Sequence, residues 1–459
     1  MGGREMKGFG NINPTSGKLV PSILLFAIPI ALGTLLQTLF NACDLIVVRM
    51  AADSTAVASV GATGTVTTLF VTSMVGIATG VNIVLARLIG AREIARAKRF
   101  ISTAIISAIG LGFLVAVFGL LFGDDVLRLM NCPEDCFEGA CTYIIVYVIS
   151  APFILLYNFA AAIIRVSGDS VRPMFYLIYA GVTNVTLNLI FCWLFADKVL
   201  AVALATVIAQ AFGAVLCMWR LMRTDGDCNF SLHNISFDFS LCGLLFRYGI
   251  PGAVTNATFA ISNLLVQGAI NSFGSSVVAG NAASNNIETA VSCITTGITS
   301  STSVFIGQNI GAQQPERVKK TLLWGIVLNC SLNFVAGLAV FLSRNPLIML
   351  FVGDDAVAMA SANARMNVVL RFYVVYSFRN IIKSSVGGFG YSRLTLIESL
   401  ISIILFRIIW MSFVYPLNPC MEMAYITYFL SACVGILVSV PMLITVAHRY
   451  FKKGISPKI

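Results

Sequence analysis

The sequence predicts an all-α integral membrane protein with twelve transmembrane helices, and three observations support this prediction. Of the 459 residues, 58% are hydrophobic and only 11% are charged, whereas soluble domains carry roughly 25% charged residues. The hydrophobic residues form long runs, and one membrane span needs about 20 of them. Two similar halves follow one another along the chain, separated by the polar stretch 224–240.

The hydrophobic runs place the twelve spans near 21–48, 56–86, 100–122, 140–163, 173–196, 199–222, 243–270, 277–306, 321–343, 357–386, 394–415 and 423–447. Each of these runs is long enough to cross the hydrocarbon core as a helix. The resulting organisation is a cytoplasmic N-tail (1–20), an N-lobe (21–223), a cytoplasmic linker (224–240), a C-lobe (241–450) and a cytoplasmic C-tail (451–459).

The basic residues set the orientation of the spans. An even number of spans puts both termini on one side, and assigning that side to the cytoplasm places most of the 30 Lys and Arg residues in cytoplasmic loops and tails. This distribution of basic residues accounts for the net charge of +10, so the charge does not indicate a nucleic-acid partner. The acidic stretches GDD 123–125 and GDD 353–355 fall on the opposite side. Each precedes a further helical run, so we expect a helix N-cap there and no metal site.

An internal repeat relates the two lobes. "ARLIGAREIARAKR" (86–99) and "GQNIGAQQPERVKK" (307–320) align at a shift of 221 residues, and Pro29 and Pro251 match at a shift of 222. Six spans per repeat give both lobes the same orientation, so a pseudo-two-fold axis along the membrane normal should relate them, with a cavity between them. The predicted structural or hinge positions are Pro29, Pro251, Gly90, Gly307, Gln308 and Gly311.

A GxxxG pair, Gly76 and Gly80, lies in the second span. Small residues at this spacing let two helix backbones approach closely. The pair therefore predicts helix packing and not chemistry.

The first span carries a polar stripe. Gln37, Asn41 and Asp44 are separated by four and three residues, so they share one face of the helix. An ionisable residue inside a membrane span is a functional candidate by default. The alternative is an acid at the outer interface, paired with Arg49.

The eighth span carries a second stripe, Asn281, Asn285, Glu288 and Ser292, at intervals of four, three and four. This stripe is either a substrate site or an interhelical hydrogen-bonding seam.

Three arginines, Arg365, Arg371 and Arg407, fall in the tenth and eleventh spans. They either pair with Glu288 or Glu398, or hold an anionic group of a substrate. The sequence leaves both roles open.

The cysteines and histidines indicate no catalytic or metal centre. Cys132, Cys136 and Cys141 share one loop, where a disulfide and free thiols are both open alternatives. The two histidines, His233 and His448, lie in polar segments. A membrane-embedded enzyme would need clustered His and carboxylates near one membrane face, and an ATPase would need a Walker A motif. We therefore expect neither enzymatic activity nor a cofactor.

Three stretches stand out: "QTLFNACDLIVVRMAADSTAVASVG", "GQNIGA", and "IIRVSGDSVRPM" with "GVTNVTLNLIF". They resemble the MATE (multidrug and toxic compound extrusion) family, in its prokaryotic type, within the wider multidrug/oligosaccharidyl-lipid/polysaccharide flippase superfamily. The resemblance implies a secondary active antiporter that exports amphipathic, cationic organic compounds in exchange for H⁺ or Na⁺ by alternating access. It also implies a monomer in the bacterial inner membrane. The alternative function is a flippase for a lipid-linked precursor, or an exporter of anionic or zwitterionic metabolites.

By this resemblance, Asp44 is the ion-coupling acid of the N-lobe, with Gln37 and Asn41 as polar neighbours. The family often has Asn followed four residues later by Asp in the fifth span, and this chain has Asn184 and Asn188 there. The missing second carboxylate favours H⁺ over Na⁺ as the coupling ion, which would bind at Asp44. In the C-lobe, the predicted substrate residues are Glu288, Asn285, Asn281, Arg371 and Arg407.

Overall fold

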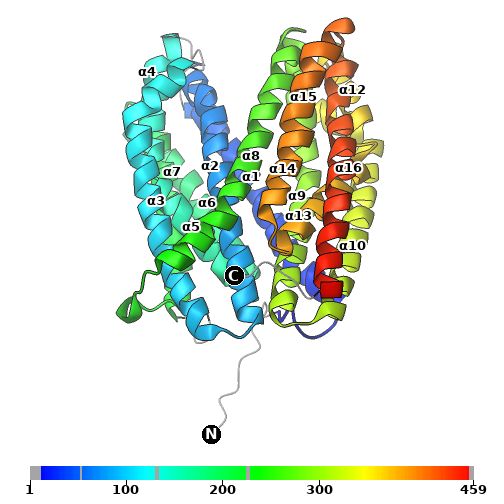
Figure 1. Cartoon of the computed structure of the whole chain (residues 1–459). Coiled ribbons are helices and arrows are strands. Elements are labelled where there is room, and N and C mark those ends of the chain that lie inside the picture. Colours follow the sequence, from blue (N-terminus) through cyan, green and yellow to red (C-terminus); the bar gives the residue numbers. More distant parts are fainter. Residues whose placement is uncertain (1–11, 52–53, 130–133, 224–227, 454–459) are drawn as a thin grey trace. The chain divides into compact units, whose positions relative to one another are not determined.

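The structure, a computed structural model, describes residues 12–51, 54–129, 134–223 and 228–453. Within these ranges it describes all side chains except those at 40–46, 48–51, 54–58, 62, 65, 129, 135 and 453. The regular structure of this part of the chain is helical throughout, as Figure 1 shows. Helices satisfy their own backbone hydrogen bonds, which is a requirement for segments that cross a lipid bilayer.

Ten helices of the described chain are long and apolar enough to cross a membrane, or eleven when the pair α4 (Glu134–Val148) and α5 (Ala151–Val166), bent by 46°, is counted as one span. These correspond to eleven of the twelve predicted spans. The remaining one, near 357–386, consists of α12 (Ala356–Val369) and α13 (Tyr373–Gly388), which are separated at Leu370–Phe372. The all-α membrane fold predicted from composition is confirmed.

The chain forms two compact units. Unit 1 comprises residues 1–12 and 32–253, and unit 2 comprises 13–31 and 254–459. These bounds differ from those of the predicted lobes in two segments, because the first part of α1 (Leu19–Ala51) belongs to unit 2 and the first part of α8 (Phe239–Asn271) to unit 1. The boundaries at Ala31 and Ala253 each lie two residues after a matched proline, Pro29 or Pro251.

Unit 1 is a helical bundle in which α2 packs against α4 and α5, α3 against α5, and α6 against α7. The long apolar runs account for these elements, and Pro152 in the first turn of α5 accounts for the break that precedes it. The helices not yet given are α2 (Ser54–Gly90), α3 (Ile94–Leu129), α6 (Val171–Leu194), α7 (Lys198–Arg223) and the short 3₁₀ helix η1 (Leu232–Asn234).

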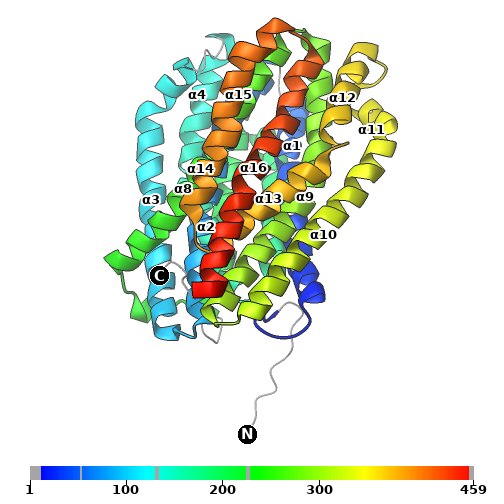
Figure 2. The same cartoon turned by 45° about the vertical axis from the view of Figure 1, so that its right-hand side comes forward.

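Unit 2 is built around α9 (Ser275–Gly311), which packs against α10, α12 and α13, while α16 packs against α12 and α13, as Figure 2 shows. The span predicted near 394–415 is irregular, since it contains two π-helical segments. The helices are α10 (Pro315–Leu342), α11 (Arg344–Val352), α14 (Ser392–Ser399), the π-helix η2 (Leu400–Leu405), α15 (Phe406–Ile409), the π-helix η3 (Trp410–Val414), the 3₁₀ helix η4 (Tyr415–Leu417) and α16 (Met421–Lys453).

The predicted GxxxG packing is confirmed within unit 1. A Cβ on Gly76 would come within 2.5 Å of Ala253 Cα, and a Cβ on Gly80 within 2.5 Å of Leu245 O. The backbones of α2 and the first part of α8 therefore touch directly.

Backbone conformations repeat at the same shift as the sequence. Positive φ angles occur at Arg92 (59°) and Gln313 (53°), 221 residues apart, and at Gly168 (101°) and Gly390 (79°), 222 residues apart. Non-glycine residues with positive φ are uncommon. Two matched pairs therefore show that the repeat is structural as well as sequential.

The two GDD stretches differ in structure. Asp355 is the N-cap of α12, where its Oδ1 accepts hydrogen bonds from the N–H groups of Val357 (2.9 Å) and Ala358 (3.0 Å), so this prediction is confirmed. Asp124 and Asp125 instead lie inside α3, which continues to Leu129. The expected N-cap there is wrong, because the helix of the third span continues through the GDD stretch instead of ending before it.

Candidate substrate sites

Unit 1 contains a polar pocket of about 390 Å³. Gln37 from α1 and Asn184 from α6 both line it, so two predicted site residues from different spans meet at one cavity. Its described lining is otherwise rich in threonines and tyrosines, and none of its described lining residues is ionisable near neutral pH. The lining includes Thr34, Thr63, Thr67, Thr68, Thr72, Tyr143, Tyr147, Tyr157, Asn158, Thr206 and Gln210.

The two asparagines of α6 form a buried hydrogen-bonded chain. Asn188 Nδ2 donates to Asn184 Oδ1 (3.2 Å), and Asn184 Nδ2 donates to Thr206 Oγ1 of α7 (3.3 Å). Asn184 is 6% exposed and Asn188 is fully buried. The helical spacing of four residues that placed both on one face of the span accounts for the contact between them.

Asn41 and Asp44 lie on α1, but their side chains, like that of Arg49, are outside the described part of the chain. The ion-coupling role of Asp44 therefore stays a prediction. The choice between a disulfide and free thiols in the loop with Cys132, Cys136 and Cys141 also stays open, because Cys132 lies outside the described residues.

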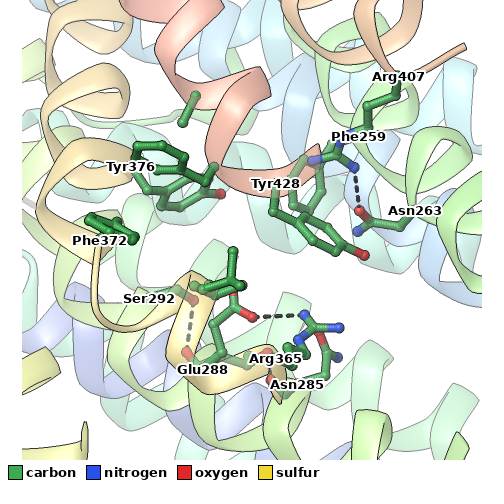
Figure 3. Close-up of a pocket in the computed structure, with 15 residues that line it drawn as sticks. Phe259, Asn263, Asn285, Glu288, Ser292, Arg365, Phe372, Tyr376, Arg407 and Tyr428 are labelled. Atoms are coloured by element: carbon green, nitrogen blue, oxygen red, sulfur yellow. Dashed lines mark hydrogen bonds and ion pairs between the residues drawn. The ribbon is translucent and has the colours of Figure 1, made fainter. Parts of the chain in front are cut away.

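Unit 2 contains a second pocket, of about 120 Å³, which is lined by charged and aromatic side chains (Figure 3). Asn285, Glu288 and Ser292 of the predicted α9 stripe line it, together with Arg365 of α12. Arg365 Nη2 and Glu288 Oε2 form an ion pair of 2.7 Å. The Arg365 side chain is 5% exposed and the Glu288 side chain 20%.

The two asparagines of the stripe complete the coordination of Arg365. Its Nη1 donates to Asn281 Oδ1 (2.7 Å), and its Nη2 donates to Asn285 Oδ1 (2.9 Å) as well as to Glu288. Of the pairings that the sequence left open for Arg365, the structure shows the one with Glu288. The stripe thus forms part of an interhelical seam and part of a pocket wall.

Arg407 lies in the same pocket, and the described part of the chain gives it no acidic partner. It is 2% exposed, and its Nη1 donates to Asn263 Oδ1 (2.8 Å). Its Cζ atom lies 4.6 Å from the ring centroid of Tyr428 and 6.0 Å from that of Phe259. No carboxylate of the described residues lies within 4.0 Å of its guanidinium.

Arg371 differs from these two arginines, because it is exposed and is absent from the residues that line the described pocket. Its recorded contact is with the ring of Phe372, at 5.8 Å from Cζ to the centroid.

A buried ionic cluster in unit 2 was not anticipated. Arg379 Nε donates to Glu398 Oε1 (2.7 Å), and Lys383 Nζ lies 3.8 Å from Glu398 Oε2. The predicted span 357–386 contains Arg379 and Lys383. Both lie on α13, and the Arg379 side chain is 3% exposed. The signal available in the sequence was the helical spacing of four residues between the two cations.

The hinge candidates at the ends of α2 and α9 occupy equivalent places. Gly90 is the last residue of α2 and Gly311 the last of α9, while Gly307 and Gln308 lie buried one turn earlier. Among the described residues, no group of three His, Cys, Asp or Glu side chains could hold a metal ion.

The repeat shift relates the two pockets residue by residue. Glu288 corresponds to Thr67 at the shift of 221, and Arg365 corresponds to Tyr143 at the shift of 222. Thr67 and Tyr143 both line the unit 1 pocket. Each repeat therefore builds a pocket at the same place in its own fold.

These features define a class of protein: a multi-span membrane transporter built from two homologous helical repeats, each with a polar pocket inside its bundle. The MatE family model matches residues 29–194 and 251–411, which together make up most of the chain. The two matches begin at Pro29 and Pro251 and so reproduce the internal repeat. The chain belongs to the MATE family of transporters and is not an enzyme.

Similar proteins cover most of the chain. The probable multidrug resistance protein YoeA of Bacillus subtilis is 26% identical over 376 residues, covering 80% of this chain and 81% of that protein. The multidrug export protein MepA of Staphylococcus aureus is 21% identical over 388 residues, covering 83% and 85%.

Solved structures support the fold. A crystal structure of MATE in complex with MaL6 is similar with a TM-score of 0.87 at 19% identity, covering 95% of this chain and 98% of that one. A MOP superfamily transporter from Pyrococcus furiosus, for which a reverse polarity of the binding pocket suggests a different function, is similar with a TM-score of 0.86 at 20% identity and the same coverage.

Proposed function

We propose that the chain is a secondary active multidrug exporter, which moves amphipathic organic compounds out of the cell in exchange for H⁺ or Na⁺ by alternating access. Family membership and the names of the relatives, multidrug resistance and multidrug export proteins, support this proposal. We further propose that the chain acts as a monomer in the bacterial inner membrane, with both termini in the cytoplasm.

The observation that carries the proposal is the convergence of Gln37 and Asn184 on one cavity in unit 1. Gln37 lies on the same helix face as Asp44, two turns earlier. Asn184 continues into the buried chain that includes Asn188. A carboxylate next to such amide oxygens can exchange a proton, Na⁺ or an organic cation, since all three are held by oxygen ligands or by negative charge.

The proposed coupling ion is H⁺. Asn188 offers an amide where the family pattern given in the sequence analysis often has a carboxylate, so the site has less negative charge with which to hold a desolvated metal cation. Binding of the ion and of a cationic compound at one carboxylate would be mutually exclusive. Linkage then requires each to weaken the other by the same factor.

Proteoliposomes containing the purified protein test this function. A pH gradient and a Na⁺ gradient are imposed separately, and transport of a cationic dye such as ethidium is followed by fluorescence. We expect transport to follow the pH gradient and to stop in Asp44→Asn. The matched control is Asp197→Asn, which removes an exposed carboxylate that caps α7 through Oδ1, a role that Asn can fill. Full gradient-driven transport by Asp44→Asn at normal expression would show that the carboxylate is an interfacial partner of Arg49.

A further inference from the structure

The charge of the unit 2 pocket is the starting point. Glu288 and Arg365 neutralise one another at 2.7 Å. Glu288 is the only carboxylate among the residues that line the described pocket, so the guanidinium of Arg407 remains as one uncompensated positive charge. Arg365 and Arg379 are close enough to act on Arg407 electrostatically, and both are also cations.

Such a charge is costly unless something compensates it. Burying an ion without a partner of opposite charge is unfavourable in the interior of a protein, and more so within a membrane span. Asn263 accepts one hydrogen bond from Arg407, and the rings of Tyr428 and Phe259 provide cation–π attraction. Arg407 Nε is buried without a hydrogen-bond partner in the described part of the chain. A guanidinium carries five N–H donors, so most of its hydrogen-bonding capacity is unused.

The backbone around Arg407 is unusual as well. Arg407 lies on α15, a single turn (Phe406–Ile409) between the π-helical segments η2 and η3. Segments of π-helix are rare and occur frequently at functional sites, because they change the direction in which one side chain points. The irregular backbone and the uncompensated charge are independent observations, and both concern Arg407.

The walls of the pocket indicate what the anion carries. Five aromatic side chains line it, and Figure 3 shows those of Phe259, Phe372, Tyr376 and Tyr428 around the charged groups, with Phe429 as the fifth. The volume is about 120 Å³, and an apolar cavity of roughly 150 Å³ holds one benzene molecule. The pocket is smaller than that cavity, so it encloses at most a single flat ring and leaves the rest of a ligand outside.

We propose that the unit 2 pocket binds the carboxylate of a small aromatic anion, or of an aromatic zwitterion, through the guanidinium of Arg407. Arg binds a carboxylate with two parallel N–H···O bonds, and the ring of the ligand stacks on the aromatic walls. The proposal rests on the export function proposed above and adds a second substrate class, aromatic anions and zwitterions, to the cationic compounds considered there. A lipid phosphate fits less well, since the described lining of the pocket offers one cation without a carboxylate partner and is otherwise largely aromatic.

Equilibrium binding to the purified protein tests the proposal in the absence of any ion gradient, which separates it from the test of antiport. The probe is radiolabelled benzoate, with unlabelled benzoate, benzamide and glycerol 3-phosphate as competitors. We expect benzamide, which has the same shape but no charge, to compete at least about tenfold more weakly than benzoate. Glycerol 3-phosphate, which mimics a lipid headgroup, should also compete weakly.

Variants locate the site. Arg407→Gln should weaken benzoate binding by about tenfold or more, and Arg407→Lys should give an intermediate affinity because it keeps the charge without the planar fork. The matched control is Arg393→Gln, which removes an exposed arginine of the same unit and should bind benzoate as the wild type does.

Three results would overturn the proposal. They are equal competition by benzoate and benzamide, equal competition by benzoate and glycerol 3-phosphate, and undiminished benzoate binding by Arg407→Gln. The first two use the wild-type protein, so a misfolded variant does not affect them. Gradient-driven dye transport can fail while benzoate binds, and the reverse, so the two proposals fail separately.

Discussion

Removing the charge of Glu398 should destabilise unit 2 strongly. Its two carboxylate oxygens serve Arg379 Nε (2.7 Å) and Lys383 Nζ (3.8 Å), and the side chains of Glu398 and Arg379 are 1% and 3% exposed. The hydroxyls of Ser402 and Ser399 also donate to this carboxylate, at 3.0 and 3.2 Å. Glu398→Gln would leave two cations in the bundle without a counter-charge.

The expected magnitude follows from burial. Breaking a buried ion pair by removing one partner costs about 3–5 kcal/mol, because the remaining charge is no longer compensated. In a unit of about 200 residues, 1 kcal/mol corresponds to roughly 2–4 °C of melting temperature, so a decrease of roughly 6–20 °C is expected. Exposed ion pairs contribute about 0–1 kcal/mol and would give no comparable change.

The assay is thermal unfolding of the purified protein, followed by intrinsic tryptophan fluorescence. The matched control is Glu316→Gln, which removes an exposed acid from the first turn of α10 in the same unit and should change the melting temperature by a degree or two at most. Replacing all three ionic groups together by apolar residues of similar size should restore much of the loss, as it does for other buried ionic groups. A melting temperature for Glu398→Gln within 2 °C of the wild type would refute this reasoning.

Three further outcomes are expected. Gly76→Ala should lower the melting temperature, because its Cβ would overlap the backbone of Ala253 at 2.5 Å, whereas Gly110→Ala, with nothing within 4 Å, should be neutral or stabilising; equal effects would contradict the packing argument. The Asp355 pKa is lowered by hydrogen bonds from the Ala358 N–H and the Ser276 hydroxyl, so its stabilising contribution is present above the ordinary carboxyl pKa and is lost as pH falls below about 4; melting temperature against pH should lose this component in Asp355→Asn. Arg317 donates hydrogen bonds to the carbonyls of Pro14, Gly17 and Ser16, so Arg317→Ala should speed hydrogen exchange or proteolysis at residues 13–18, and unchanged protection would argue against this role.

Features that depend on local sequence could be predicted. Hydropathy and residue spacing were enough to find the hydrophobic runs, the repeat and the glycine pair. The structure agrees with each of them, through eleven spans, the repeated backbone angles and the contact between α2 and α8, respectively. The Asp355 cap is similarly local, because its donors lie two and three residues further along the chain.

Features that depend on helix rotation and on distant partners could not be predicted. The sequence offered Glu288 and Glu398 as partners for three arginines, and the choice was decided by which face of α12 meets α9. Arg379 falls inside the predicted span 357–386, but hydropathy alone could not identify its compensating acid, Glu398, nineteen positions away on another helix. The π-helical segments around Arg407 have no sequence signature, since they arise from how the helix of this span packs.

The repeat separates what the fold requires from what one site requires. The α9 stripe of Asn281, Asn285, Glu288 and Ser292 corresponds, at the shift of 221, to a set in the first repeat that also lines a pocket: Val60, Gly64, Thr67 and Val71. The same helical fold therefore forms with apolar and hydroxyl groups at these positions, so the Glu288–Arg365 pair is not needed to build the bundle. Buried ion pairs contribute little net stability once desolvation is counted. The pair lies in a pocket wall beside Arg407, which has no acidic partner among the described residues. We therefore propose that the value of the pair lies in the charge pattern that it presents to a ligand.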